Sequence, residues 1–133
     1  MELSSYVAEI AGHQRKIVGA DVRPVRIAHG DKGLPVRAGK SLPFKVTRAW
    51  NAPMGYYRES WYLVHPKSRE VLFEGPEREI RIWGLQSYTE FSDTISESFR
   101  LEPGPYLLVL ALDRTLGGEV EIEAIEVPAE EAA

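Results

Sequence analysis

The sequence predicts a single all-β domain, and three observations support this prediction. Short segments in which apolar and polar residues alternate recur along nearly the whole chain, as in half-buried antiparallel strands. Nine prolines and eleven glycines separate these segments at short intervals, which is typical of strands joined by turns. No segment has a strong helical period or the strand–helix alternation of a parallel sheet, so the candidate architectures are a sandwich and a barrel.

The length and composition indicate one domain with a packed core. The chain has 133 residues, of which 44% are hydrophobic and 27% are charged, close to the average for globular proteins. We expect one β domain over residues 1–133, with an N-terminal extension at 1–15 and a flexible acidic tail at 128–133.

The charge pattern and the lack of cysteine exclude several classes of function. The 16 basic and 20 acidic residues are mixed along the chain and give a net charge of −4, without a basic stripe for a phosphate backbone. We therefore expect no nucleic-acid partner. Without cysteine there is no disulfide framework and no thiolate catalysis. The first residues do not resemble a secretory signal, and no apolar run approaches the ~20 residues of a membrane span, so we expect a cytoplasmic protein without a membrane partner.

The first third of the chain predicts a helical turn followed by three strands. Residues 4–12 have apolar positions three and four apart, as in a short helix. The alternation over 17–28 predicts a strand, and Pro24 places it at a sheet edge because proline cannot donate to a ladder. Residues 29–33 have turn composition, and residues 34–46 predict two short strands around a tight turn at 38–40.

The middle of the chain predicts three strands. Residues 57–65 alternate, with Tyr57, Trp61 and Leu63 on one face. Residues 66–69 then form a hairpin turn that leads into a strand at 70–74. Alternation in residues 79–82 predicts another half-buried antiparallel strand.

The last third predicts three more strands with two irregular positions. Residues 91–101 alternate, but Glu97 falls on the apolar phase, which a bulge or an arginine partner would explain. Both phases of residues 106–112 are apolar, so we expect a central strand shielded on both sides, on one side by a neighbouring chain if the protein associates. Residues 119–127 alternate and then slip by one residue at Ile125, which indicates a β-bulge.

Two motifs resemble bacterial immunoglobulin-like sandwich domains. In RLEPGPYLLVLALD, residues 100–113, Tyr106 follows Gly104 by two positions, as at the corner before the sixth strand of these domains. The resemblance implies that the Tyr106 hydroxyl bonds back to the main chain. It also implies that Leu108 and the strand containing Phe44 replace the disulfide, and that Trp61 is the core tryptophan.

The stretch VRAGKSLPFKV is similar to the entry into the second strand of many such modules. The resemblance implies an immunoglobulin-like antiparallel β-sandwich of about seven to nine strands. The order of a charged hairpin, a serine-rich strand and L-x-PG-x-Y is also similar to the polysaccharide-binding C-terminal domain of O-antigen ABC transporters. Such a likeness supports the fold more than the role.

The sequence offers no complete catalytic or metal-binding motif. The histidines, His13, His29 and His65, have no second ligand at a diagnostic spacing, and His29 with Asp31 fits a plain turn as well as an ion site. There is no G-x-S-x-G elbow and no phosphate-binding glycine loop. We therefore predict a non-enzymatic protein without a cofactor or metal; a small hydrolase or metal-dependent enzyme would depend on His29, Asp31 and His65.

The segment AWNAPMGYYRESWY, residues 49–62, is the most informative for function. Aromatic rings give a large contact area at little cost in rotamer entropy, so an aromatic loop suits a protein interface or a sugar-stacking platform. Trp61 is the one expected in the core. The residues predicted to form a binding surface are Trp50, Met54, Tyr56, Tyr62 and Trp83.

These observations lead to two hypotheses for function. The first is an interaction module that binds a protein partner, or a second copy of itself as a homodimer, through the aromatic loop or a sheet edge. The alternative is a carbohydrate-binding sandwich module, which Trp50, Tyr56 and Trp83 would also suit.

Overall fold

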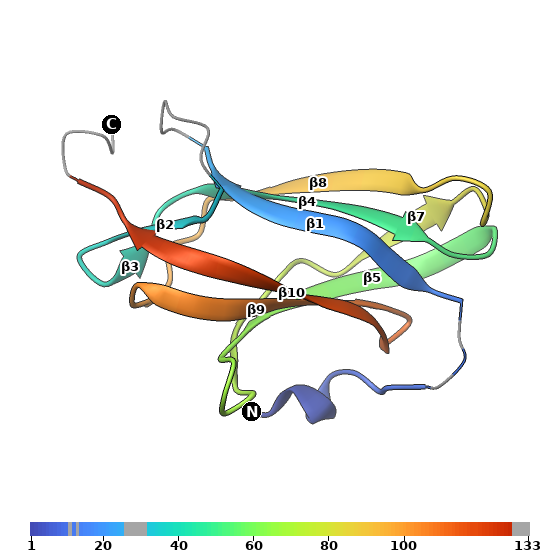
Figure 1. Ribbon diagram of the computed structural model, residues 1–133, viewed down its shortest axis with the longest axis horizontal. Coiled ribbons are helices and arrows are strands. Elements are labelled where there is room, and N and C mark those ends of the chain that lie inside the picture. The colour runs from blue at the N-terminus through green and yellow to red at the C-terminus, as the bar shows by residue number, and fades with distance from the viewer. Residues whose placement is uncertain (11, 13, 26–31, 129–133) are drawn as a thin grey trace.

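The computed structural model describes residues 1–10, 12, 14–25 and 32–128. Within them, one 3-10 helix at Leu3–Ser5 precedes ten strands (Figure 1). The strands are β1 (Lys16–Pro24), β2 (Leu34–Arg37), β3 (Lys40–Ser41), β4 (Phe44–Asn51), β5 (Gly55–Val64), β6 (Val71–Glu74), β7 (Arg78–Ile82), β8 (Thr89–Ile95), β9 (Gly104–Leu112) and β10 (Thr115–Glu126). No helix in the described part of the chain is long and apolar enough to cross a membrane.

The strands form two sheets. The smaller sheet has the order β1-β4-β8, and the larger has the order β3-β2-β10-β9-β5-β6, with β7 pairing β5 next to β6. The ladders are antiparallel except that between β2 and β10, where residues 34–36 run parallel to residues 124–126. The all-β prediction is confirmed.

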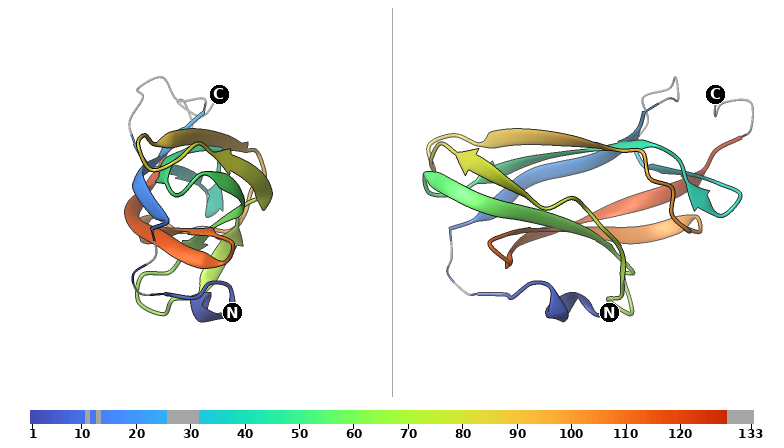
Figure 2. Two further views of the ribbon diagram at one scale, coloured as in Figure 1. Left: turned by 90° about the vertical axis from the view of Figure 1, so that its right-hand side faces the viewer. Right: turned by 180° about the vertical axis from the view of Figure 1, so that it is seen from behind.

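The architecture differs from the expected immunoglobulin-like sandwich. The seven-stranded sheet curls strongly into a half-barrel, and the three-stranded sheet covers its open side (Figure 2). The described residues form ten strands instead of seven to nine. One of them, β3, has only two residues. Gly39, with a positive φ, turns the chain sharply between β2 and β3.

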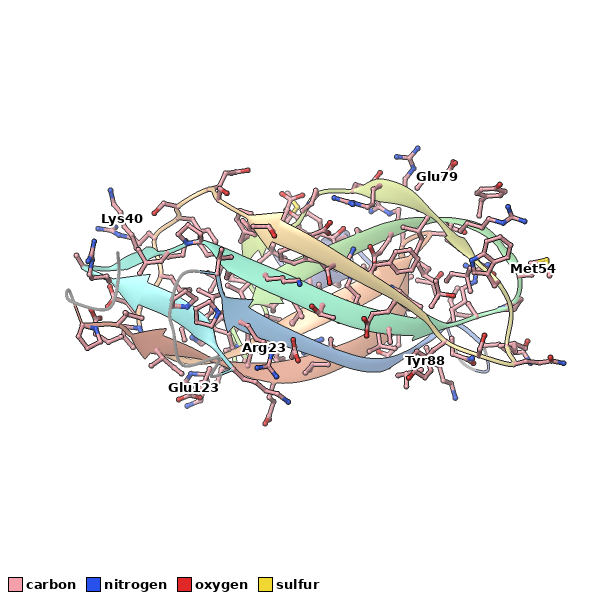
Figure 3. The ribbon with its side chains drawn as sticks, turned by 90° about the horizontal axis from the view of Figure 1, so that it is seen from above. Arg23, Lys40, Met54, Glu79, Tyr88 and Glu123 are labelled. Carbon is pink, nitrogen blue, oxygen red and sulfur yellow. The ribbon has the colours of Figure 1, made fainter. Side chains whose placement is uncertain are left out.

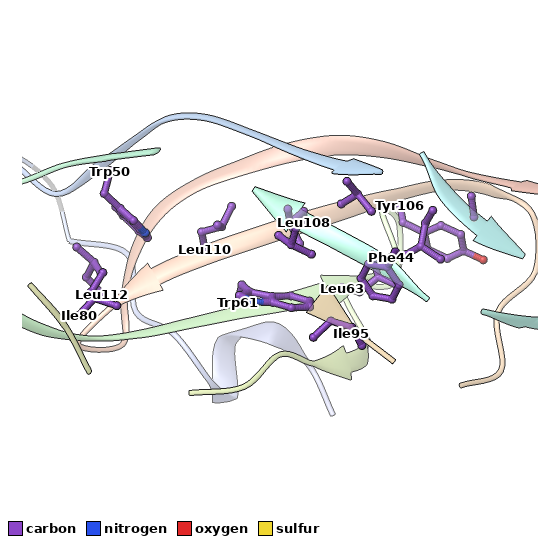
Figure 4. Packing of buried hydrophobic residues seen from close by; sticks show 14 of the residues in the cluster. Phe44, Trp50, Trp61, Leu63, Ile80, Ile95, Tyr106, Leu108, Leu110 and Leu112 are labelled. Atoms are coloured by element: carbon purple, nitrogen blue, oxygen red, sulfur yellow. The ribbon is translucent and has the colours of Figure 1, made fainter. Parts of the chain in front are cut away.

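The core fills the space between the two sheets, as the period-two alternation predicts. Inward residues of β4, β5 and β9 meet there with the rings of Trp50 and Trp61 (Figure 4). The two rings leave no room for side chains beside them. A Cβ on Gly75 would lie 2.2 Å from the Trp61 ring, and one on Gly117 would lie 2.2 Å from the Trp50 ring.

The outer face of β5 and β9 is covered by the chain's own N-terminal segment, Met1–Ile10 (Figure 1). Leu3 is buried there against Tyr62, Val64 and Val109, and the backbone nitrogen of Leu3 donates to the carbonyl of Arg69 at 2.9 Å. Both phases of β9 are therefore shielded within one chain, without the neighbouring chain that we considered. The predicted helical turn at 4–12 is wrong in extent, because among the described residues of the N-terminal segment only Leu3–Ser5 are helical.

Two further predictions need correction. The β10 ladder shifts register between Leu116 and Gly118, where it passes the Trp50 ring, and Ile125 is exposed instead of turning inward. Glu97 lies beyond the end of β8 and is exposed, so it needs neither a bulge nor a buried partner. Except for Pro128, the predicted acidic tail lies outside the described residues.

Candidate interaction surface

Two loops meet at one end of the molecule: residues 52–54 between β4 and β5, and residues 83–88 between β7 and β8. Asn51 ties them together, because its side-chain nitrogen donates to the carbonyl oxygens of Leu85 at 3.0 Å and Ser87 at 3.4 Å. The Tyr57 hydroxyl donates to the carbonyl of Pro53 at 2.6 Å, which holds the first loop. Both loops are therefore supported by strand residues.

A stacked arginine lies beside these loops. Tyr56 on β5 is directly opposite Arg81 on β7, and Trp83 follows the end of β7. The guanidinium carbon of Arg81 is 4.0 Å from the centre of the Trp83 ring and 5.5 Å from the centre of the Tyr56 ring, within the range of cation–π contacts. Among the described residues no carboxylate forms an ion pair with Arg81. Its guanidinium is thus ordered by the rings and retains donors for a ligand.

Several exposed and mostly apolar side chains belong to these two loops and the adjacent strand ends. Met54, Tyr56 and Trp83 are 68%, 64% and 58% exposed, and Leu85 and Tyr88 are exposed as well. Met54 and Tyr88 lie toward the same end of the molecule (Figure 3). We call this set the aromatic end surface; it consists of Met54, Tyr56, Arg81, Trp83, Leu85 and Tyr88.

The structure places only part of the predicted binding surface here. Met54, Tyr56 and Trp83 belong to it, but the prediction is wrong for Trp50 and Tyr62, which are both buried. Trp50 is still within β4, on the phase that points into the core. The ring of Tyr62 lies 4.9 Å from the ring of Tyr6, under the N-terminal segment.

Sequence reasoning missed three members of the aromatic end surface. Leu85 and Tyr88 are in the β7–β8 loop, which the hydrogen bond from Asn51 to the Leu85 carbonyl holds at the end of β4 although the loop is distant in the sequence. Arg81 could have been predicted, because its alternation with Ile80 and Ile82 indicates a side chain that points outward.

A buried charged cluster lies beneath this end, between the two sheets. Arg48 on β4 and Glu59 on β5 are both fully buried. Arg48 Nε donates to Glu59 Oε2 at 2.8 Å, Arg48 Nη2 donates to Glu59 Oε1, and Trp50 Nε1 donates to Glu59 Oε2 at 2.6 Å. Asp93 on β8 adds a second carboxylate 2.9 Å from Arg48 Nη2.

The charges in this cluster balance. Asp93 Oδ1 lies 2.5 Å from Nη2 of Arg78, a half-exposed residue at the start of β7, so two arginines face two carboxylates. Burial acts to lower the pKa of Arg48, but the hydrogen bonds and charges of Glu59 and Asp93 outweigh it, so the pKa of Arg48 is raised. Every charge has a partner, and the cluster joins β4, β5, β7 and β8.

The predicted structural residues lie in the core. Trp61, Phe44 and Leu108 are buried in one cluster with Tyr106. The Tyr106 hydroxyl donates to the carbonyl of Glu102 at 2.7 Å, which is the bond back to the main chain that the sequence predicts. Burial of the Tyr106 hydroxyl raises its pKa.

The residues weighed for metal or hydrolytic chemistry do not form a site in the part of the chain that is described. His65 Nδ1 accepts from the backbone nitrogens of Lys67 and Ser68, both at 3.2 Å, and so stabilises the β5–β6 turn. No group of three histidine or acidic side chains is arranged to hold a metal within the described ranges. His13, His29 and Asp31 lie outside them.

Comparison with known proteins shows the fold alone. No protein-family model matches the sequence, and no curated protein matches it. The chain is similar to part of the Pseudomonas fluorescens alkylpurine DNA glycosylase AlkC bound to DNA containing an abasic site analog. That match has a TM-score of 0.53 and 12% identity over 85% of this chain and 31% of that chain. A beta-glucosidase from Listeria innocua, a D270A mutant in complex with laminaribiose, matches with a TM-score of 0.46 and 11% identity over 80% of this chain and 16% of that chain. The chain thus spans less than a third of either protein.

Proposed function

We propose that this domain is a non-enzymatic interaction module that binds a protein partner through the aromatic end surface. The observation that carries the proposal is Arg81, which is stacked against Trp83 and Tyr56, two exposed aromatic side chains. Tryptophan, tyrosine and arginine are the residue types that most often dominate binding energy at protein interfaces, and methionine is enriched there too.

Two physical arguments support a partner on this surface. A contiguous group of exposed apolar side chains is unfavourable in water and commonly marks a contact site. The stack also restricts the rotamers of Arg81 before binding, and this reduces the entropy lost when a partner orders the side chain. The bonds from Asn51 and Tyr57 to the loop carbonyls similarly keep the backbone ordered.

The proposal is tested by comparing how much partner protein the wild type and matched variants capture. Immobilised wild-type protein is compared with Tyr56→Ser and Trp83→Ser, and Leu72→Ser, an exposed apolar residue on β6, is the control. We expect a bound protein that both end-surface variants lose and the control retains. Once it is purified, titration should show at least about a tenfold loss of affinity for Trp83→Ser, as at an interface hot spot. Equal binding by all four proteins would contradict the proposal.

Carbohydrate binding is the second candidate, supported by the exposed rings of Tyr56 and Trp83 and by the guanidinium donors of Arg81. The aliphatic side chains of Met54 and Leu85 favour a protein partner instead. Of the three tryptophans, only Trp83 is exposed, so its fluorescence reports on this surface. A glycan array followed by fluorescence titration would support the second candidate if binding shifts the wild-type emission and the shift disappears in Trp83→Phe.

We also propose that the architecture is a curled variant of the immunoglobulin-like sandwich. The hydrogen bond from Tyr106 to Glu102 supports this, because it has the form of the corner that precedes the sixth strand in those domains. The shared burial of Trp61 and Leu108 in one core supports it further.

A further inference from the structure

Strand β7 has an unpaired edge. It pairs with β5 through residues 55–59, and no other described strand forms a ladder with it. Its inward phase is Arg78, Ile80 and Ile82, and its outward phase is Glu79 and Arg81. Glu79 lies at the margin of the molecule seen from above (Figure 3).

The outward charges of this edge complement themselves. If β7 pairs antiparallel with β7 of a second copy about Ile80, Glu79 of each copy lies opposite Arg81 of the other. Opposite charges at directly facing positions stabilise a sheet, whereas like charges there destabilise it. Edge strands commonly carry charge that discourages pairing, but here the order Glu-Ile-Arg is complementary in charge to its own reverse.

We propose that the protein forms a two-fold symmetric homodimer in which the two β7 strands pair antiparallel about Ile80. Within each copy Arg58 is opposite Glu79, and Tyr56 is opposite Arg81. Pairing therefore continues the cross-strand row Arg58–Glu79 into Arg81–Tyr56 of the second copy, so each Glu79 has an arginine at both neighbouring positions of the row. The symmetry gives two such rows, and the contact is closed because each strand uses the same edge.

The neighbouring edge lacks this complementarity. The outward side chains of β8 are Glu90, Ser92 and Thr94, which would set Glu90 opposite Thr94 in a symmetric pair about Ser92. No opposite charge is available there. The charge pattern therefore favours β7 over β8 as the pairing edge.

The test is the mass of the purified protein by light scattering and sedimentation over micromolar concentrations. The wild type should have twice the chain mass of 15.0 kDa. Glu79→Arg and Arg81→Glu each replace two attractive cross-strand pairs with two repulsive ones, so each should raise the dimer dissociation constant at least about tenfold. The double variant E79R/R81E restores opposite charges across the dimer in reversed order, but it also sets an arginine opposite Arg58 within each copy. Its dissociation constant should therefore fall below those of both single variants, toward that of the wild type.

Controls separate pairing at β7 from an effect of net charge. Glu121→Arg on β10 and Lys40→Glu on β3 make the same changes in charge at exposed sites elsewhere, and both should leave the dimer unchanged. Circular dichroism of each variant checks that it is folded. A wild type that is monomeric at every concentration would overturn the inference, and so would a dimer indifferent to both single reversals.

The dimer shares Arg81 with the aromatic end surface, but it is measured without any partner and is therefore tested separately from the proposed function. The double variant distinguishes the two proposals: it should regain the dimer yet remain defective in partner capture, since Arg81 is absent from the aromatic end surface. Partner capture by a strictly monomeric wild type would overturn the dimer alone. If both hold, the two-fold axis gives one assembly two aromatic end surfaces, and a partner with two copies of its binding site would gain avidity.

Discussion

Arg48 and Glu59 form a bidentate ion pair that joins the two sheets, and both side chains are fully buried. A buried ion pair recovers its desolvation cost only with good geometry and further hydrogen bonds, which Trp50 and Asp93 supply here. The pair fixes the position of β4 on β5, since a slip by one residue would leave both charges without a partner.

Breaking this pair from one side should destabilise the fold. Glu59→Leu or Arg48→Met leaves an uncompensated charge in the core and should cost about 3 to 5 kcal/mol in the free energy of unfolding, measured with urea. The double variant R48M/E59L should be more stable than the sum of the single losses predicts. Strictly additive losses would show that the two residues do not act as a pair. Arg58→Met on the exposed face of β5 is the control and should change stability by less than about 1 kcal/mol.

The corner tyrosine should contribute one hydrogen bond. Tyr106→Phe removes the bond to the Glu102 carbonyl but leaves the ring packed, so it should lower the free energy of unfolding by about 1 kcal/mol. Tyr88→Phe, at an exposed position, is the matched control and should have no effect. Equal stability of Tyr106→Phe and the wild type would mean that the corner does not depend on this bond.

Gly117 should not tolerate a side chain. The added methyl group of Gly117→Ala would overlap the Trp50 ring, and the overpacking should cost about 1 to 3 kcal/mol. Gly19→Ala is the control, because a Cβ at Gly19 would have no atom within 4 Å. Thermal unfolding of the two variants side by side is the measurement, and similar midpoints would contradict the close approach of Trp50 to this backbone.

The N-terminal segment should act as part of the core. Leu3→Ala removes a buried side chain from its contact with Val64 and Val109 and should cost about 2 to 5 kcal/mol. Ile10→Ala, at an exposed position in the same segment, should cost little. Binding of a hydrophobic dye should rise in Leu3→Ala only. An unchanged unfolding midpoint for Leu3→Ala would show that the segment does not contribute to stability.

The ion pair between Arg69 and Glu119 predicts a dependence of stability on pH. The hydrogen bonds and charge of Arg69 lower the pKa of Glu119 below its usual value of 4.5. A carboxyl group whose pKa is lowered by folding adds stability above its unfolded pKa, and this stability is lost as the pH falls through the folded pKa. Both side chains are partly exposed, so the contribution should stay below about 1 kcal/mol.

The measurement is the difference in urea stability between the wild type and Glu119→Gln. It should be present at pH 7 and shrink as the pH falls below about 4.5. Glu121→Gln, two residues along the same strand, controls for the loss of one negative charge. A difference that does not vary between pH 7 and pH 3 would contradict the pairing.

The sequence predicted the features that depend on local patterns. Alternation identified the phases of Trp61 and Leu63, and the spacing of Gly104 and Tyr106 identified the corner, because both depend on residues close in the chain. Met54, Tyr56 and Trp83 were recognised as exposed for a similar reason, since they lie in or beside turns.

The remaining features depend on contacts between distant segments. Trp50 was predicted at the surface because it precedes a loop, yet its ring is buried by Gly117, which is far along the chain. The buried carboxylates are Glu59 and Asp93 instead of Glu97, because their partner Arg48 comes from a different strand. Local periodicity cannot reveal such a partner.

The parallel ladder between β2 and β10 has a consequence for the speed of folding. It joins residues 34–36 to residues 124–126, so the larger sheet is complete only when segments from opposite thirds of the chain have met. Closing so long a loop costs conformational entropy before the contacts that offset this cost can form. Proteins dominated by such pairings fold in about milliseconds to seconds. Until β10 docks, the edges of β2 and β9 that it pairs with stay open, so this last closure is the step at which aggregation would compete with folding.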